Sequence, residues 1–174
     1  MAYHPMEYPY SAILMEDALY LYKQVDGVNY YTNTIAKGGP LLNIQVSVCG
    51  TYLSYIEVAD PMLRLVVYHL NTATKELNQV FYKEIEAEPG TEYSIVYNHS
   101  GTAVAFQVVW YEVVVVDLVK GTHEDYALKE RQHLPNYNQL LLPVSDNNFI
   151  WTGYDNHIRL IRFREQGMST VACI

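Results

Sequence analysis

The sequence predicts an all-β fold, an antiparallel β-sandwich or jelly-roll barrel of about ten strands. Seventeen tyrosines occur among the 174 residues, most of them in short runs with valine, isoleucine, leucine and threonine. These side chains suit a pleated surface that is buried on one side. Glycine, proline and asparagine turn signals separate the runs at short intervals. No helical pattern connects consecutive runs, which favours antiparallel pairing.

The first ten residues predict an extended arm, because they are rich in proline and tyrosine and show no core periodicity. We expect this arm, residues 1–10, to dock on a neighbouring subunit through Tyr3, Tyr8 and Tyr10. The alternative is a disordered terminus. Residues 11–174 are expected to form one domain, since a chain of this length suits a single core.

The strands are expected as a regular series along the chain. After the alternating run 19–22, Asp26 and Gly27 form the strongest hairpin signal in the sequence. A turn at 37–40 leads into the long run 42–58, in which Gly50 indicates a bulge or bend. Further strands, each bounded by turn residues, are expected at 63–70, 80–86, 91–98, 149–151, 158–163 and 168–174.

The run 103–119 is apolar on both faces. A strand covered on both sides is central or interfacial, and one straight strand of this length would be too long for a small sandwich. The run must therefore bend, break or reach into another chain. Little else in the sequence is available to cover its second face, so we expect Tyr111, Val113 and Val115 to contact another subunit.

One short helix is expected near residues 123–133. Thr122 and Asp125 have the spacing of a helix start, and Pro135 ends the pattern. His123 and His133 would face different sides of such a helix, which argues against a metal site.

Composition restricts the class of partner. Half of the residues are hydrophobic and 17% are charged, so part of the apolar surface is expected to meet another chain. The net charge of −8 argues against direct nucleic-acid binding, which depends on Lys and Arg. No signal peptide is visible, and the longest apolar stretch, 108–116, is too short for a transmembrane segment.

Three of the five arginines lie close together on one predicted strand, at positions 159, 162 and 164. Guanidinium groups match phosphates and carboxylates, so Arg159, Arg162 and Arg164 are candidate contacts for an anionic partner. The alternative is a solvated strand whose arginines pair with Glu84, Glu86 and Glu88. The two cysteines, Cys49 and Cys173, could be bridged or free, and the sequence does not choose between these states.

Trp151, Tyr154 and Asn156 could form a glycan platform, because aromatic faces stack on sugars and amides bind hydroxyls. The alternative places Trp151 in the core. No catalytic, metal or cofactor motif is present. We therefore expect a non-enzymatic protein without a cofactor.

Residues 88–95, with the sequence EPGTEYSI, resemble a turn-to-strand pattern of jelly-roll and sandwich accessory domains. With its N-terminal arm, its strand series and its doubly apolar run, the chain resembles small single-jelly-roll virion proteins, which are coat or decoration subunits. This resemblance implies a capsid component of the virion, made in the host cytoplasm. It would self-associate as a homo-oligomer or dock on a larger capsid protein, away from the genome. A lectin-like module that binds glycans is the alternative function.

Overall fold

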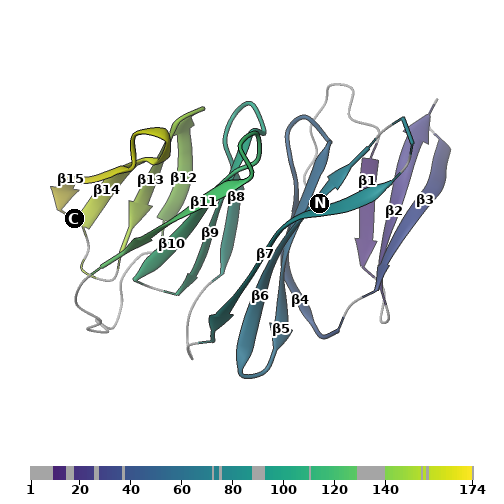
Figure 1. Cartoon of the computed structure of the whole chain (residues 1–174), viewed down its shortest axis with the longest axis horizontal. Helices are drawn as coiled ribbons and strands as arrows, with labels where there is room; N and C mark the ends of the chain where they lie inside the picture. The colour runs from purple at the N-terminus through teal and green to yellow at the C-terminus, as the bar shows by residue number, and fades with distance from the viewer. Residues whose placement is uncertain are drawn as a thin grey trace.

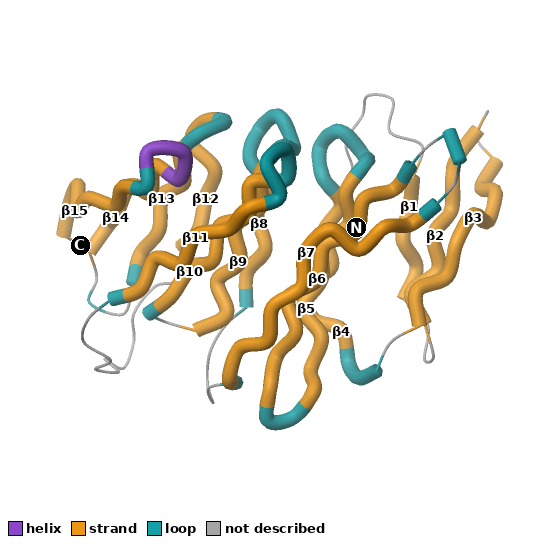
Figure 2. Tube along the Cα trace, in the orientation of Figure 1, coloured by secondary structure: helices purple, strands orange, loops and turns teal. Residues whose placement is uncertain are grey.

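The computed structural model describes residues 10–14, 18–25, 28–36, 38–71, 73–74, 76–87, 93–109, 111–128, 140–153, 155 and 157–173. These residues form fifteen strands and a single 3-10 turn, η1 (Phe163–Glu165). The strands make four sheets that stand side by side in chain order (Figure 1). Strands and short loops account for almost all of the trace (Figure 2).

Each sheet is an antiparallel meander of consecutive strands. The first sheet contains β1 (Tyr10–Leu14), β2 (Ala18–Val25) and β3 (Val28–Ala36). The second contains β4 (Leu41–Val46), β5 (Tyr52–Ala59), β6 (Met62–Leu70) and β7 (Leu77–Glu86). The third contains β8 (Ser94–Tyr97), β9 (Ala103–Val109), β10 (Glu112–Asp117) and β11 (Thr122–Ala127). The fourth contains β12 (Leu140–Ser145), β13 (Asn148–Thr152), β14 (His157–Arg162) and β15 (Gly167–Cys173).

The all-β antiparallel class is confirmed, but the sandwich or jelly-roll barrel is wrong. A jelly roll pairs strands that are distant in sequence. Among the described residues, each strand instead pairs only with its sequence neighbours in the same sheet. Short turns explain this preference, because they return the chain at once to the strand that it has just left.

Two turns show how local sequence sets this pairing. Val25 lies opposite Val28 across the β2–β3 pair, so the hairpin predicted from Asp26 and Gly27 is confirmed. Gly50 is not a bulge within one strand. It has a φ of 69° in the turn between β4 and β5, a conformation that favours glycine, and its N–H donates to the Ser47 carbonyl over 2.8 Å.

The doubly apolar run 103–119 breaks into the antiparallel hairpin of β9 and β10. Its two faces are buried within the chain itself. One face packs against the second sheet through Val104, Phe106 and Val114. The other face packs against the fourth sheet, and there Val113 and Val115 are buried. Tyr111 is also buried, so the subunit contact expected at these three residues is wrong.

The helix expected near 123–133 is also wrong over the part that the structure describes. Residues 122–127 form β11, which pairs with β10 and places Tyr126 opposite Val113. Tyr126 is buried in the core between the third and fourth sheets. Burial of the Tyr126 ring and backbone hydrogen bonding along the edge of β10 stabilise a strand here more than the capping signal stabilises a helix. Residues 129–133 lie outside the described part.

Three apolar cores fill the spaces between consecutive sheets. The first strands of the second, third and fourth sheets lie beside one another, since β8 contacts both β4 and β12. The sheets therefore converge on one side and spread apart on the other. The expected arm lies outside the described residues except for Tyr10, which begins β1.

Candidate functional site

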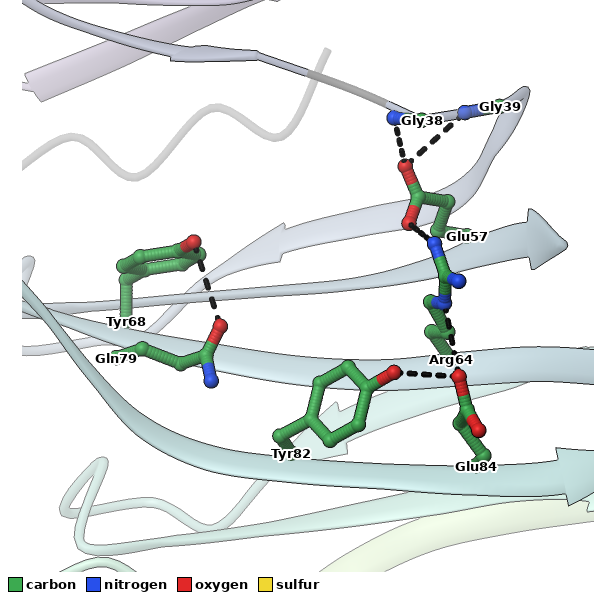
Figure 3. A network of polar contacts seen from close by, with 8 residues as sticks. All are labelled: Gly38, Gly39, Glu57, Arg64, Tyr68, Gln79, Tyr82 and Glu84. Carbon is green, nitrogen blue, oxygen red and sulfur yellow. Dashed lines mark hydrogen bonds and ion pairs between the residues drawn. The ribbon is translucent and has the colours of Figure 1, made fainter.

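A chain of polar contacts crosses the second sheet and ends at an exposed strand (Figure 3). Glu57 on β5, Arg64 on β6 and Glu84 on β7 are cross-strand neighbours, so their side chains share one face. Arg64 donates from Nη1 to Glu57 Oε2 over 3.2 Å and from Nε to Glu84 Oε1 over 3.1 Å. The guanidinium thus bridges a buried and an exposed carboxylate.

The loop before β4 anchors the inner end of this network. Glu57 is buried and its Oε1 accepts the N–H of Gly38 and, over 3.1 Å, the N–H of Gly39. A side chain at position 39 would have no room, because a Cβ there would lie 2.0 Å from the Val58 carbonyl oxygen. Glycine at 39 therefore allows the backbone to approach the carboxylate.

The outer end is held by a tyrosine. The hydroxyl of Tyr82 donates to Glu84 Oε1 over 2.5 Å, and this bond together with Arg64 holds the pKa of the Glu84 carboxyl below its usual range. The same bond raises the pKa of Tyr82. Tyr82 is therefore an oriented phenol, fixed beside a carboxylate that stays ionised.

The exposure of Tyr82 follows from the unequal size of two sheets. Tyr55, Val66 and Tyr82 form one cross-strand row, in which the relative exposures are 4%, 3% and 47%. The first sheet covers the inner members of this row. It has three strands in the described part of the chain, whereas the second sheet has four, and β7 lies beyond the cover. We call the open surface formed by Arg64, Tyr68, Gln79, Tyr82 and Glu84 the β7 face.

The β7 face combines groups that recognise proteins. Tyr68 donates to Gln79 over 3.5 Å, and these two side chains lie on the same side of the sheet as Tyr82 and Arg64 (Figure 3). Tyrosine and arginine are enriched at the centres of protein interfaces. The interface residues predicted from the sequence lie elsewhere, because only the strand register brings Glu57, Arg64 and Glu84 together.

A groove of about 400 Å³ lies where the third and fourth sheets meet. Its walls include Asp117, Lys120, His123, Glu124 and Arg164. Asp117 is buried and pairs with Arg164 Nε over 3.4 Å, so two of its charges already neutralise each other. The described residues contain no group of three or more side chains that could hold a metal ion.

The three candidate arginines do not converge on one site. Arg159 is buried, donates from Nη1 to Asp155 over 2.8 Å and lies over the Trp151 ring. Arg162 donates to the Ser169 hydroxyl over 3.1 Å, and Arg164 pairs with Asp117. The three side chains therefore have separate partners within the described residues, and these partners are not Glu84 or Glu86.

The glycan platform is not formed as expected. Trp151 is fully buried in the core between the third and fourth sheets, where no sugar can stack on it. Tyr154 and Asn156 lie outside the described residues, as do Tyr3, Tyr8 and His133. Cys49 and Cys173 are both free thiols, which decides between the two states that the sequence left open.

Solved structures of other proteins contain a similar arrangement of sheets, although comparisons of the sequence find no match. No protein family matches the sequence, and no curated protein does. Among solved structures, the C-terminal WD40 domain of Sif2 matches 95% of this chain with a TM-score of 0.62 and 14% identity. Apo AztD from Citrobacter koseri matches 95% with a TM-score of 0.63 and 12% identity, and the RRP9 WD40 repeats match 92% with a TM-score of 0.53 and 12% identity.

The fold is β-propeller-like. The four sheets correspond to propeller blades, which are typically four-stranded meanders. In the described residues the first sheet has three strands and the other three have four. The chain spans 45%, 46% and 46% of the lengths of the Sif2, AztD and RRP9 chains, so it corresponds to somewhat less than half of each.

The propeller fold corrects the functional expectations drawn from the sequence. The neighbours are WD40 propellers and not virion jelly rolls, so the resemblance to capsid proteins is wrong, and with it the expected capsid function. The lectin-like alternative finds no support in these structures either. No helix in the described residues has the length and hydropathy of a membrane span.

Proposed function

We propose that this chain is a non-enzymatic protein-binding module that uses its β7 face to hold an extended segment of another protein. The observation that carries the proposal is the preorganised Glu57–Arg64–Glu84–Tyr82 network beside an open aromatic surface. Preorganised side chains lose little freedom on binding, which favours affinity. WD40 domains mediate protein–protein interactions, and the propeller fold supports the same role here.

The charges around the β7 face favour a basic partner. Glu76, Glu84 and Glu86 are exposed on or beside β7, and the whole chain carries a net charge of −8. Arg64 is the one cation of the β7 face and already bridges two carboxylates. A partner segment that carries lysine or arginine next to an apolar or aromatic residue would match both the charge and the tyrosine rings.

The test uses affinity capture followed by measurement of direct binding. Wild-type chain, Tyr82→Ala and the control Val119→Ala are used to capture proteins from the source cells. Val119 is 69% exposed in the turn after β10, away from the β7 face. A captured protein is then purified, and its Kd for each variant is measured by calorimetry.

We expect Tyr82→Ala to weaken binding of that protein by about 30-fold, the effect of losing one interface hot spot. Val119→Ala should bind like the wild type. The proposal is wrong if Tyr82→Ala and Glu84→Ala both bind as tightly as the wild type, or if no captured protein binds directly.

A further inference from the structure

The outer edge of β7 carries backbone groups that no strand of the described chain pairs with. β7 is the last strand of the second sheet, and within the described residues its one partner strand is β6. In an antiparallel pair, residues that bond to the partner strand alternate with residues whose N–H and C=O groups point away from it. The pairing therefore leaves a row of donors and acceptors along the free edge of β7.

The end of the strand shows which residues point outwards. The N–H of Ala87 donates to the Pro61 carbonyl over 2.9 Å, and these two residues continue the register of the β6–β7 pair. Because the bonding residues alternate along the strand, Ile85 and Lys83 also bond to β6. The backbone groups that point to the free edge belong to the residues in between, which are Tyr82, Glu84 and Glu86.

The side chains of these three residues lie on the open side of the sheet. Side chains alternate along a strand, so Glu86 shares the side of Glu84 and Tyr82, and all three are exposed. The edge therefore offers backbone hydrogen-bonding groups and exposed side chains at the same positions. An extended segment placed along this edge would contact both, as in peptide recognition by strand addition.

The outermost strand of the third sheet lacks this combination. The β10–β11 register points the backbone groups of His123 and Asp125 away from β10. Their side chains, however, contact β7. The ring centroids of His123 and Phe81 lie 5.3 Å apart, and Asp125 pairs with Lys83 over 2.5 Å. These contacts hold β7 against the third sheet, so its edge loses little freedom when a partner binds.

We propose that the partner segment adds to the free edge of β7 as an antiparallel fifth strand of the second sheet. This inference rests on the proposed function and specifies how the β7 face holds its partner. All strand pairs of the described sheets are antiparallel, which favours the same orientation for the added strand. In that orientation, basic residues opposite Glu86 and Glu84 and an aromatic residue opposite Tyr82 match the edge. The partner segment therefore carries these three residues at every second position.

The first test compares two peptides of equal composition. In acetyl-Thr-Lys-Thr-Lys-Thr-Tyr-Thr-amide, both lysines and the tyrosine share one side of a strand. In acetyl-Thr-Thr-Lys-Lys-Tyr-Thr-Thr-amide they cannot, because neighbouring side chains point to opposite sides. We expect the wild-type chain to bind the alternating peptide about tenfold more tightly than the second peptide, with both values of Kd measured by calorimetry.

N-methylation then tests the backbone hydrogen bonds. In the proposed pairing, the N–H groups of the lysines and the tyrosine point to β7, and those of the threonines point away. N-methylation of the second lysine should weaken binding about tenfold, because one backbone hydrogen bond is lost. N-methylation of the threonine that follows it should leave Kd unchanged. On the protein side, Glu86→Pro should bind the peptide about tenfold more weakly than Glu86→Ala, because both lack the carboxylate and only proline lacks the N–H.

Equal effects of the two methylations overturn the added strand, as does equal binding by Glu86→Pro and Glu86→Ala. An alternating peptide that does not bind at millimolar concentration also overturns it. None of these results decides the proposed function, which stands or falls on the captured protein and its dependence on Tyr82 and Glu84. A captured protein that needs Tyr82 but binds Glu86→Pro and Glu86→Ala equally would show that the β7 face binds through side chains alone.

Discussion

The guanidinium of Arg159 lies 5.6 Å from the ring centroid of Trp151, its cross-strand neighbour on β13. The sequence assigned these two residues to separate ligand sites, an anion site and a sugar platform. In the structure they pack against each other inside the protein, and Arg159 also makes a bidentate ion pair with Asp155. A buried guanidinium is tolerated here because it has both a carboxylate and an aromatic face.

Asp155→Asn should destabilise the fold by about 2 kcal/mol, less than a fully buried pair would lose because Asp155 is partly exposed. Thermal and urea unfolding would measure the change. The hydrogen bonds from Arg159 lower the pKa of the Asp155 carboxyl, so its contribution is complete above the unfolded pKa of about 3.9 and is lost as pH falls through the lower folded pKa. Wild type and variant should therefore converge in stability in strong acid. An equal difference at neutral and very low pH would contradict this role.

Val113→Asp should prevent folding, because Val113 is fully buried between the third and fourth sheets. An unpaired carboxylate there would cost at least about 4 kcal/mol, a large part of the stability of a domain. Val119→Asp is the matched control, since the same substitution at an exposed turn position should change stability by less than about 0.5 kcal/mol. Circular dichroism and soluble yield compare the two. A folded Val113→Asp chain would show that the third and fourth sheets are not packed together.

Gly39→Ala should destabilise the chain by about 2 kcal/mol, because the added methyl group would collide with the Val58 carbonyl and displace the loop from Glu57. Gly167→Ala is the control. The nearest atom to its added methyl lies 4.0 Å away, so this change should be neutral or slightly stabilising. Urea midpoints of the two variants would show the difference, and equal midpoints would mean that the loop at 38–39 is not held by Glu57.

Much of the local structure could be predicted from the sequence. The alternation in β2 and the Asp26-Gly27 signal predicted a hairpin, because both depend on residues close together in the chain. The two apolar faces of 103–119 correctly indicated burial on both sides. The sequence could not show that this burial was internal, because the covering residues Phe149 and Ile161 come from strands much later in the chain.

The sheet arrangement and the β7 face were not predictable for a similar reason. The blades have no convincing sequence repeat, so a propeller could not be told from a sandwich by strand spacing alone. The sequence offered Glu84 only as a possible partner of the arginines at 159, 162 and 164, and it did not place Glu57 or Arg64 beside it. Their alignment depends on the register of three strands, which a one-residue shift would destroy.

The phenol of Tyr97 is buried beside the Ser54 hydroxyl and is hydrogen-bonded to it. Burial raises its pKa well above the ordinary value. The folded state therefore favours the neutral phenol. Its contribution is complete below the unfolded pKa of about 10 and is lost as pH rises above that value.

Stability should accordingly fall steeply above pH 10, and Tyr97 should ionise only when the chain unfolds. Phenolate absorbance and circular dichroism, recorded together during an alkaline titration, would check this. In Tyr97→Phe, the rise in phenolate absorbance that accompanies unfolding should be smaller by the contribution of one tyrosine. The variant should also be less stable at neutral pH by about 1 kcal/mol, because Ser54 loses this hydrogen-bond partner. If the late step is the same size in Tyr97→Phe and wild type, Tyr97 titrates with the accessible tyrosines, and the packing of β8 against β5 is looser than the structure shows.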